Sequence, residues 1–114
     1  MSEQKTMLIA GSDSYTETML NVLHCHVRTA WFMNYQFIMD GRNAVSADAL
    51  MYCKKWDAAF RVMSCPDGII EALETGQIQR VVLLGMASEC TFRLARIEQT
   101  AKQHGVEVVT QFFG

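Results

Sequence analysis

The sequence is poor in the features that would mark a disulfide scaffold or a zinc module. Its four cysteines, Cys25, Cys53, Cys65 and Cys90, form no C-x-x-C pair and no zinc-finger spacing. We therefore predict free thiols, a reducing cytoplasmic location and no metal site.

Long apolar runs and strong positive charge are also missing. No run approaches the roughly 20 apolar residues that span a bilayer, and the polar segment Met1–Thr6 does not resemble a signal peptide. The net charge is −2, and Lys54–Lys55 is the only adjacent basic pair. Long nucleic acids bind through many phosphate contacts. We expect neither a membrane nor a long nucleic acid as partner, whereas a small phosphorylated ligand needs few cations.

What remains is an ordinary globular composition, in which half of the 114 residues are hydrophobic and about a fifth are charged. The length fits one domain, residues 1–114, with no repeat, linker or low-complexity segment. A chain of this size buries enough surface for a core without disulfides.

Short apolar runs that suit buried strands alternate with segments of helical periodicity. The expected strands are 7–11, 35–39, 58–63, 80–85 and 106–112. Arg61 interrupts the third of these strands and places it near a sheet edge. Alternation of this kind predicts an α/β domain, a three-layer doubly wound Rossmann-like fold with a five-stranded, mainly parallel sheet.

Capping residues stand before the expected helices. Ser14 with Glu17 has the spacing of a capping box, Ser46 is expected to cap the second helix with Asp48 in its first turn, and Ser88 is expected to cap the last. Pro66 suits the first position of the third helix, which should end at Gly76.

Three strand-end loops, 11–14, 40–43 and 85–88, should meet at one edge of the sheet. Glycine permits close approach of backbone, and helix N-termini favour anions. In such sheets ligands bind outside the carboxyl ends of the strands. The candidate ligand-binding residues are Gly11, Ser12, Asp13, Tyr15, Asp40, Gly41, Arg42, Asn43, Asp48, Gly85, Met86 and Ser88.

The roles within this set differ. Arg42 can fork onto a phosphate or a base edge, or form a surface ion pair. Asp40 is suited to ribose hydroxyls. Asp48 is a dipole complement or a catalytic carboxylate, and Tyr15 either stacks on a base or packs. Ser88 offers a hydroxyl beside a helix start.

Other polar side chains have simpler interpretations. His24 and His26 point about 200° apart on a helix and cannot share a metal ion unaided. Glu89–Arg93 and Glu98–Lys102 have the i,i+4 spacing of ion pairs on a solvated helix face.

Three segments carry a family resemblance. Gly11-Ser12-Asp13-Ser14-Tyr15-Thr16 resembles the G-[GS]-R-[DE]-[WFY]-[ST] opening of the small YspA-like branch of the SLOG superfamily. The segment from Gly41 to Trp56 resembles its H-G-G-A-x-G-A-D-x-L-A-x-x-W signature. Gly85-Met-Ala-Ser88, followed by Arg93-Leu-Ala and Gly105-Val-Glu-Val, resembles its last loop, helix and strand.

The resemblance implies a Rossmann-like fold that binds nucleotides or nucleotide-derived ligands. Some members of the superfamily cleave the N-glycosidic bond of nucleoside monophosphates, and others are sensors in defence systems. Asp13 stands where the family has arginine, Ser14 where it has an acid, and the phosphoribohydrolase loop has lost its glutamate. These changes favour binding without turnover and leave no catalytic residue assigned.

Three hypotheses follow. The first is a ligand-binding module that senses or sequesters a nucleotide derivative, in phage–host defence on the family analogy, with no cofactor. The second is a nucleotide-cleaving enzyme using Asp40 or Asp48. The third is a structural oligomer subunit. A homo-oligomer is expected because large apolar side chains lie near segment ends: Trp31, Phe32, Met33, Tyr35, Phe112 and Phe113.

Overall fold

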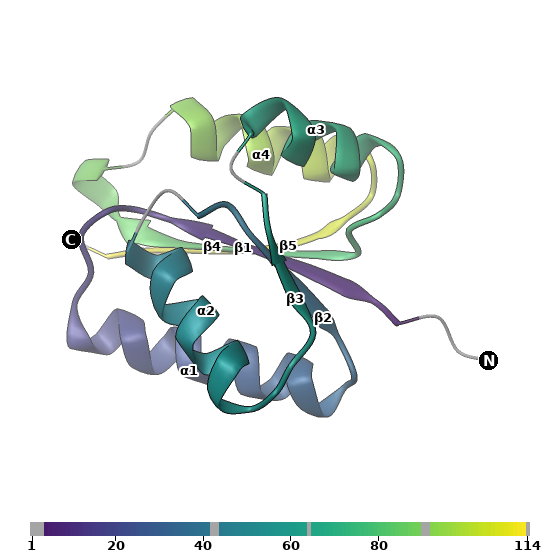
Figure 1. Ribbon diagram of the computed structural model, residues 1–114. Helices are drawn as coiled ribbons and strands as arrows, with labels where there is room; N and C mark the ends of the chain where they lie inside the picture. Colours follow the sequence, from purple (N-terminus) through teal and green to yellow (C-terminus); the bar gives the residue numbers. More distant parts are fainter. Residues whose placement is uncertain (1–3, 42–43, 64, 90–91, 114) are drawn as a thin grey trace.

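The computed structural model describes residues 4–41, 44–63, 65–89 and 92–113. Strands and helices alternate within these ranges (Figure 1). In chain order the elements are β1 (Thr6–Gly11), α1 (Glu17–Phe32), β2 (Gln36–Met39), α2 (Ala44–Lys55), β3 (Phe60–Val62), α3 (Pro66–Glu74), β4 (Arg80–Met86), the 3₁₀ turn η1 (Ala87–Glu89), α4 (Phe92–Gln103) and β5 (Glu107–Phe113).

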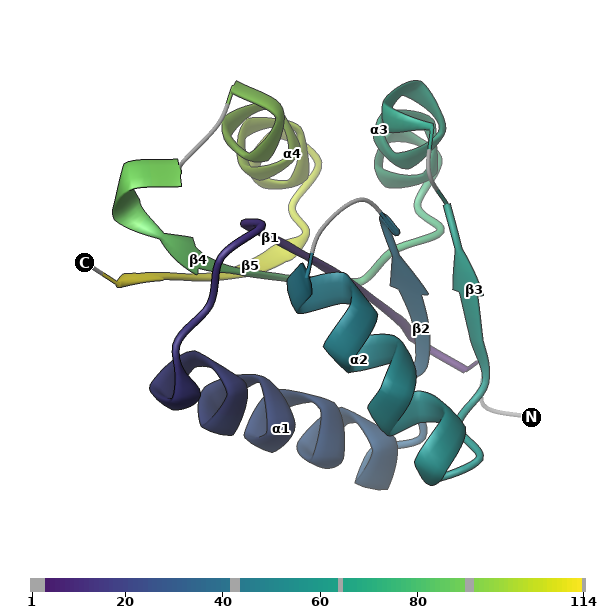
Figure 2. The same cartoon turned by 60° about the vertical axis from the view of Figure 1, so that its left-hand side comes forward.

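The strands form one sheet in the order β3-β2-β1-β4-β5, and every neighbouring pair is parallel. Helices α1 and α2 cover one face, and α3 and α4 cover the other (Figures 1 and 2). The predicted three-layer α/β fold is confirmed, and the sheet is parallel throughout rather than mainly parallel.

The central strand β1 explains why its sequence is an unbroken apolar run. Met7 and Ile9 pack in the cluster under α1 and α2, and Leu8 and Ala10 pack under α3 and α4. All four side chains are fully buried. A strand covered on both faces has no solvent side that a polar residue could occupy.

Strand β3 lies at a sheet edge, as the alternation around Arg61 predicts. Phe60, Arg61 and Val62 are all exposed, and β3 pairs only with β2 among the described strands. Helix α3 starts with Pro66 at its first turn, and Gly76 beyond its end has a positive φ of 77°, both as expected.

The predicted first cap is wrong. Helix α1 is capped by Thr16, whose hydroxyl accepts the Met19 N–H at 3.2 Å. Ser14 instead lies in the loop, where its carbonyl accepts the Ser12 hydroxyl at 2.7 Å and its N–H donates to Glu89. These contacts hold Ser14 away from the position of the cap.

The other two predicted serine caps are also wrong. Helix α2 begins at Ala44, so Ser46 lies inside its first turn and Asp48 lies beyond that turn. The hydroxyl of Ser46 bonds to the Ile9 carbonyl of β1 and to Asp40, which follows β2. Ser88 belongs to η1, because the chain makes this extra turn before α4 begins at Phe92.

Two functional classes can be addressed from the described residues. None of their helices has both the length and the apolar content to cross a membrane. The same part of the chain contains no group of three or more His, Cys, Asp and Glu side chains that could hold a metal ion. His24 packs between aromatic rings, 4.9 Å from Tyr52 and 5.1 Å from Trp56 by ring centroids.

Candidate functional site

The strand order fixes where a ligand site is expected. From β1 the chain moves outward to β2 and β3, and then crosses back to place β4 on the other side of β1. The strand order therefore reverses between β1 and β4. In open α/β sheets the crevice at the carboxyl ends of these two strands is the usual binding place.

At this crevice the loops after β1 and β4 are bonded to each other. The Ser12 N–H donates to the Leu84 carbonyl at 3.2 Å, and the Met86 N–H donates to the Ser12 hydroxyl oxygen at 3.0 Å. Ser12 is 4% exposed. A Cβ on Gly85 would lie 3.1 Å from the Ser12 side chain. Gly85 therefore makes room for Ser12.

A carboxylate of the chain itself reaches into the same crevice. Glu89, at the end of η1, accepts the Ser14 N–H at 3.2 Å. Without Glu89, the Ser14 N–H would be able to donate to an anionic ligand. The 3₁₀ turn thus supplies an internal anion to the loop after β1.

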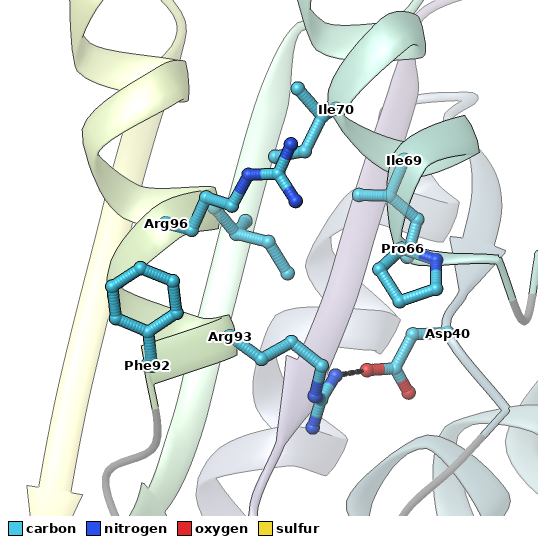
Figure 3. Close-up of a pocket in the computed structure, with 8 residues that line it drawn as sticks. Asp40, Pro66, Ile69, Ile70, Phe92, Arg93 and Arg96 are labelled. Carbon is cyan, nitrogen blue, oxygen red and sulfur yellow. Dashed lines mark hydrogen bonds and ion pairs between the residues drawn. The ribbon is translucent and has the colours of Figure 1, made fainter.

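Beside the crevice lies a buried ion pair. Asp40 follows β2 and is 1% exposed, and Arg93, in the first turn of α4, donates to its Oδ2 atom (Figure 3). Arg93 also donates to the Gly11 carbonyl at 3.3 Å. The Ser46 hydroxyl, which lies 2.9 Å from Asp40 Oδ1 and 3.3 Å from the Ile9 carbonyl oxygen, completes a network that joins the ends of β1 and β2 to α2 and α4.

This network corrects the sequence-based interpretation of Arg93, which placed it on a solvated face paired with Glu89. Its side chain is only 26% exposed and points to Asp40, while Glu89 bonds to Ser14. Burial lowers the pKa of the Arg93 guanidinium, and the nearby Asp13 carboxylate opposes that shift. Arginine stays charged in proteins, so Arg93 is the cation that Asp40 requires.

A cavity of about 170 Å³ opens next to the ion pair, between α3 and α4 (Figure 3). Its walls are mostly apolar, and the charged side chains of Asp40 and Arg93 form one end. Its lining residues are Asp40, Pro66, Ile69, Ile70, Phe92, Arg93, Arg96 and Ile97.

Two of these residues stand at the rim. Phe92 is 86% exposed, the most exposed large apolar side chain among those described. Arg96 makes a 3.4 Å pair with Asp67, and the side chains of the two residues are 47% and 84% exposed. Such a pair in solvent is weak, so a ligand can compete for Arg96.

A second hollow of about 210 Å³ lies on the other side of Arg93, at the β1–β4 crevice. Its lining residues are Gly11, Ser12, Asp13, Glu89 and Arg93. Arg93 is therefore the wall shared by an apolar cavity and a polar hollow.

The predicted site residues are brought together only in part. Asp40 lines the cavity, and Gly11, Ser12 and Asp13 line the hollow. Met86 donates its N–H to Ser12, and Gly85 makes room for the Ser12 side chain. Gly41 is exposed with a φ of 73°, and Arg42 and Asn43 lie outside the described residues. Tyr15, 45% exposed, and Ser88 line neither space.

Asp48 lies on the opposite face of the sheet from the cavity. Its neighbours in α2, Val45 and Ala49, belong to the core cluster under α1 and α2. Burial raises the pKa of the Asp48 carboxyl, and its Oδ2 atom has no hydrogen-bond partner within the described part of the chain. Asp48 therefore cannot act with Asp40 on one ligand in this cavity.

Most of the cavity was not among the residues predicted from the sequence, namely Pro66, Ile69, Ile70, Phe92, Arg93, Arg96 and Ile97. One signal for Arg93 was present. A buried carboxylate at a strand end needs a cation, and Arg93 follows another of the three strand-end loops, the one after β4. The apolar members gave no signal, because core and cavity residues have the same pattern.

Comparison with models of known protein families finds no match to this chain, and comparison with curated proteins finds none either.

Proposed function

We propose that the protein binds a nucleotide-like small molecule at the carboxyl edge of its sheet and does not turn it over. The observation that carries this proposal is the apolar cavity between α3 and α4, closed at one end by the Asp40–Arg93 pair. Ligand sites in proteins are typically apolar hollows with a few placed polar groups. The resemblance to SLOG proteins favours the same ligand class.

The walls suit a flat ring with polar edges. Ile69, Ile70 and Ile97 provide apolar surface for the ring faces, and Phe92 stands at the rim where it can stack on a base. Arg93, at the inner end, offers N–H donors of its guanidinium. An aromatic base matches this combination.

The same geometry favours binding over glycosidic cleavage. Cleavage needs a carboxylate free to support an oxocarbenium-like sugar. Asp40 is held by Arg93 on one oxygen and by Ser46 on the other. Asp48 is on the other face. The biological role that the family analogy adds is sensing or sequestering a signalling nucleotide, as in phage–host defence.

The test combines thermal stability with ligand integrity. The purified protein is incubated with adenine and guanine nucleosides, their mono- and triphosphates, cyclic dinucleotides and ADP-ribose, and each mixture is analysed by thermal melting and chromatography. A ligand at a hundred times its Kd stabilises by about 2.7 kcal/mol, which raises Tm by about 10 °C or more in a domain of this size. Release of free base would contradict binding without turnover, and the absence of any shift would contradict binding itself.

A matched pair of variants locates the site. Phe92→Ala removes an exposed ring at the cavity, and Phe32→Ala removes a 69% exposed ring on α1, on the opposite face. Loss of a stacking ring is expected to weaken binding roughly fivefold, within the range of about 0.5–1.5 kcal/mol for aromatic pairs. Phe32→Ala should leave the affinity unchanged. Equal effects of the two variants would place the ligand elsewhere.

A further inference from the structure

We infer that the ligand carries a single anionic group, bound at Arg96 on the outer rim, and that the crevice between β1 and β4 excludes polyphosphates. This inference rests on the proposed function and specifies its ligand class: a nucleoside monophosphate, or a molecule of the same size and charge, with its base inward and its phosphate outward.

The charges in the crevice oppose a phosphate. The hollow contains the carboxylates of Asp13 and Glu89 and one guanidinium, that of Arg93. Arg93 is already paired with the buried Asp40. Among the described residues, three carboxylates therefore surround this cation, and a phosphate placed here would add further charge of the same sign.

Two backbone donors of the crevice are also in use. The Ser14 N–H donates to Glu89 at 3.2 Å, and the Met86 N–H donates to Ser12 at 3.0 Å. Phosphate-binding loops instead present free N–H groups to the ligand. To bind here, a phosphate would have to displace the Glu89 carboxylate while facing Asp13.

The outer rim offers the opposite environment. Arg96 is half-exposed and extends from α4 over the cavity (Figure 3). Its present partner, Asp67, is 3.4 Å away and almost fully in solvent. A guanidinium binds a phosphate through two parallel hydrogen bonds, so one phosphate can replace this weak contact. Asp67 remains nearby and disfavours a second negative charge.

The volume of the cavity also favours a ligand with one base and one phosphate. Its volume of about 170 Å³ is below the roughly 300–1,000 Å³ of typical small-molecule sites. One base therefore fits inside with the sugar and phosphate toward the rim. A cyclic dinucleotide has two bases and two phosphates, and it exceeds the space in this cavity.

The test measures the affinity of one base in three charge states, as nucleoside, monophosphate and triphosphate, by calorimetry in the adenine and guanine series. The wild-type protein should bind the monophosphate at least about fivefold tighter than the nucleoside. It should bind the triphosphate no tighter than the monophosphate.

Variants assign this preference to residues. Arg96→Gln should abolish the difference in affinity between monophosphate and nucleoside, measured as the ratio of the two Kd values in each protein. Lys102→Gln, which removes another exposed cation of α4 paired with an acid, should preserve the difference. Asp13→Asn, in an exposed loop position, should improve triphosphate binding relative to the monophosphate.

The outcomes separate the two proposals. Tighter binding of the triphosphate or of a cyclic dinucleotide would overturn the inference and leave the proposed function intact. Equal affinity for nucleoside and monophosphate, or a preference that survives Arg96→Gln, would also overturn it. Failure of every compound to bind would overturn the proposed function, and this inference with it.

Discussion

The Asp40–Arg93 pair is expected to be the strongest single electrostatic determinant of stability in the described structure. Asp40 is 1% exposed and Arg93 is 26% exposed in its side chain. Replacement of Arg93 by Met removes a cationic partner of this buried carboxylate, and breaking a buried ion pair costs about 3–5 kcal/mol. A domain of this size has about 5–15 kcal/mol of total stability, so Arg93→Met should remove a large part of it.

The partner substitution should cost less. Asp40→Asn removes the buried charge and keeps an oxygen that can accept the Ser46 hydroxyl, 2.9 Å away. Arg93 then loses its partner but can still reach water, and the expected cost is about 1–3 kcal/mol. The double variant removes both charges of this pair. It should therefore be more stable than Arg93→Met alone.

Urea unfolding followed by circular dichroism measures all four proteins. With an m-value of about 1–3 kcal/mol/M, a loss of about 4 kcal/mol moves the midpoint of Arg93→Met by roughly 2 M. Adding Asp40→Asn should restore part of this shift. Strictly additive losses, with no recovery in the double variant, would refute the pairing of a buried carboxylate with Arg93.

Three shorter predictions concern other parts of the molecule. Burial raises the pKa of the Cys53 thiol to about 12. In peptide-resolved alkylation of the native protein, Cys53 should therefore react at least about a hundredfold more slowly than the exposed Cys25. Equal rates would contradict its burial. Gly11→Ala should lower the free energy of unfolding in urea by about 1–3 kcal/mol, because the new Cβ would overlap a carbonyl oxygen of β4. The control Gly68→Ala lies inside α3, where the new Cβ makes ordinary contacts of 3.5 Å, and it should be neutral or stabilising. Burial lowers the pKa of His26 from its ordinary value of 6.5. As pH falls below 6.5, the unfolded chain therefore takes up a proton before the folded protein does, and stability is lost. His26→Gln should reduce the difference between the unfolding midpoints at pH 7.5 and 5.5, and an unchanged difference would exclude this histidine as its source.

The fold was predictable because its strongest determinants are local in the sequence. The apolar run of β1 indicates burial on both faces, and Arg61 within β3 indicates an edge, and both are confirmed. Helix starts were less predictable. Ser14 and Ser46 are good caps by residue type, but both are engaged by distant groups, Ser14 by Glu89 and Ser46 by Asp40. Such partners are invisible in a local pattern.

The same limitation explains the error about Arg93. By spacing alone, Glu89 and Arg93 form a reasonable ion pair one helical turn apart. The pairing requires one continuous helix across both residues, but η1 ends at Glu89 and α4 begins at Phe92. With the helix interrupted, the two side chains point to different loops. Tertiary contacts decide where a chain makes an extra turn. Here Glu89 contacts Ser14, whereas Arg93 contacts Asp40.

The glycines of the strand-end loops lead to a similar distinction about function. In the sequence, Gly11 and Gly85 suggest room for a ligand to approach the backbone. In the structure, a Cβ on Gly11 would meet the Leu84 carbonyl and the Val45 side chain, and a Cβ on Gly85 would meet Ser12. The space that these glycines leave is filled by the protein itself. Glycines that admit protein atoms do not indicate a phosphate site, and the carboxylate of Glu89 already accepts the Ser14 N–H. The cavity that we propose as the ligand site lies on the other side of Arg93, between α3 and α4.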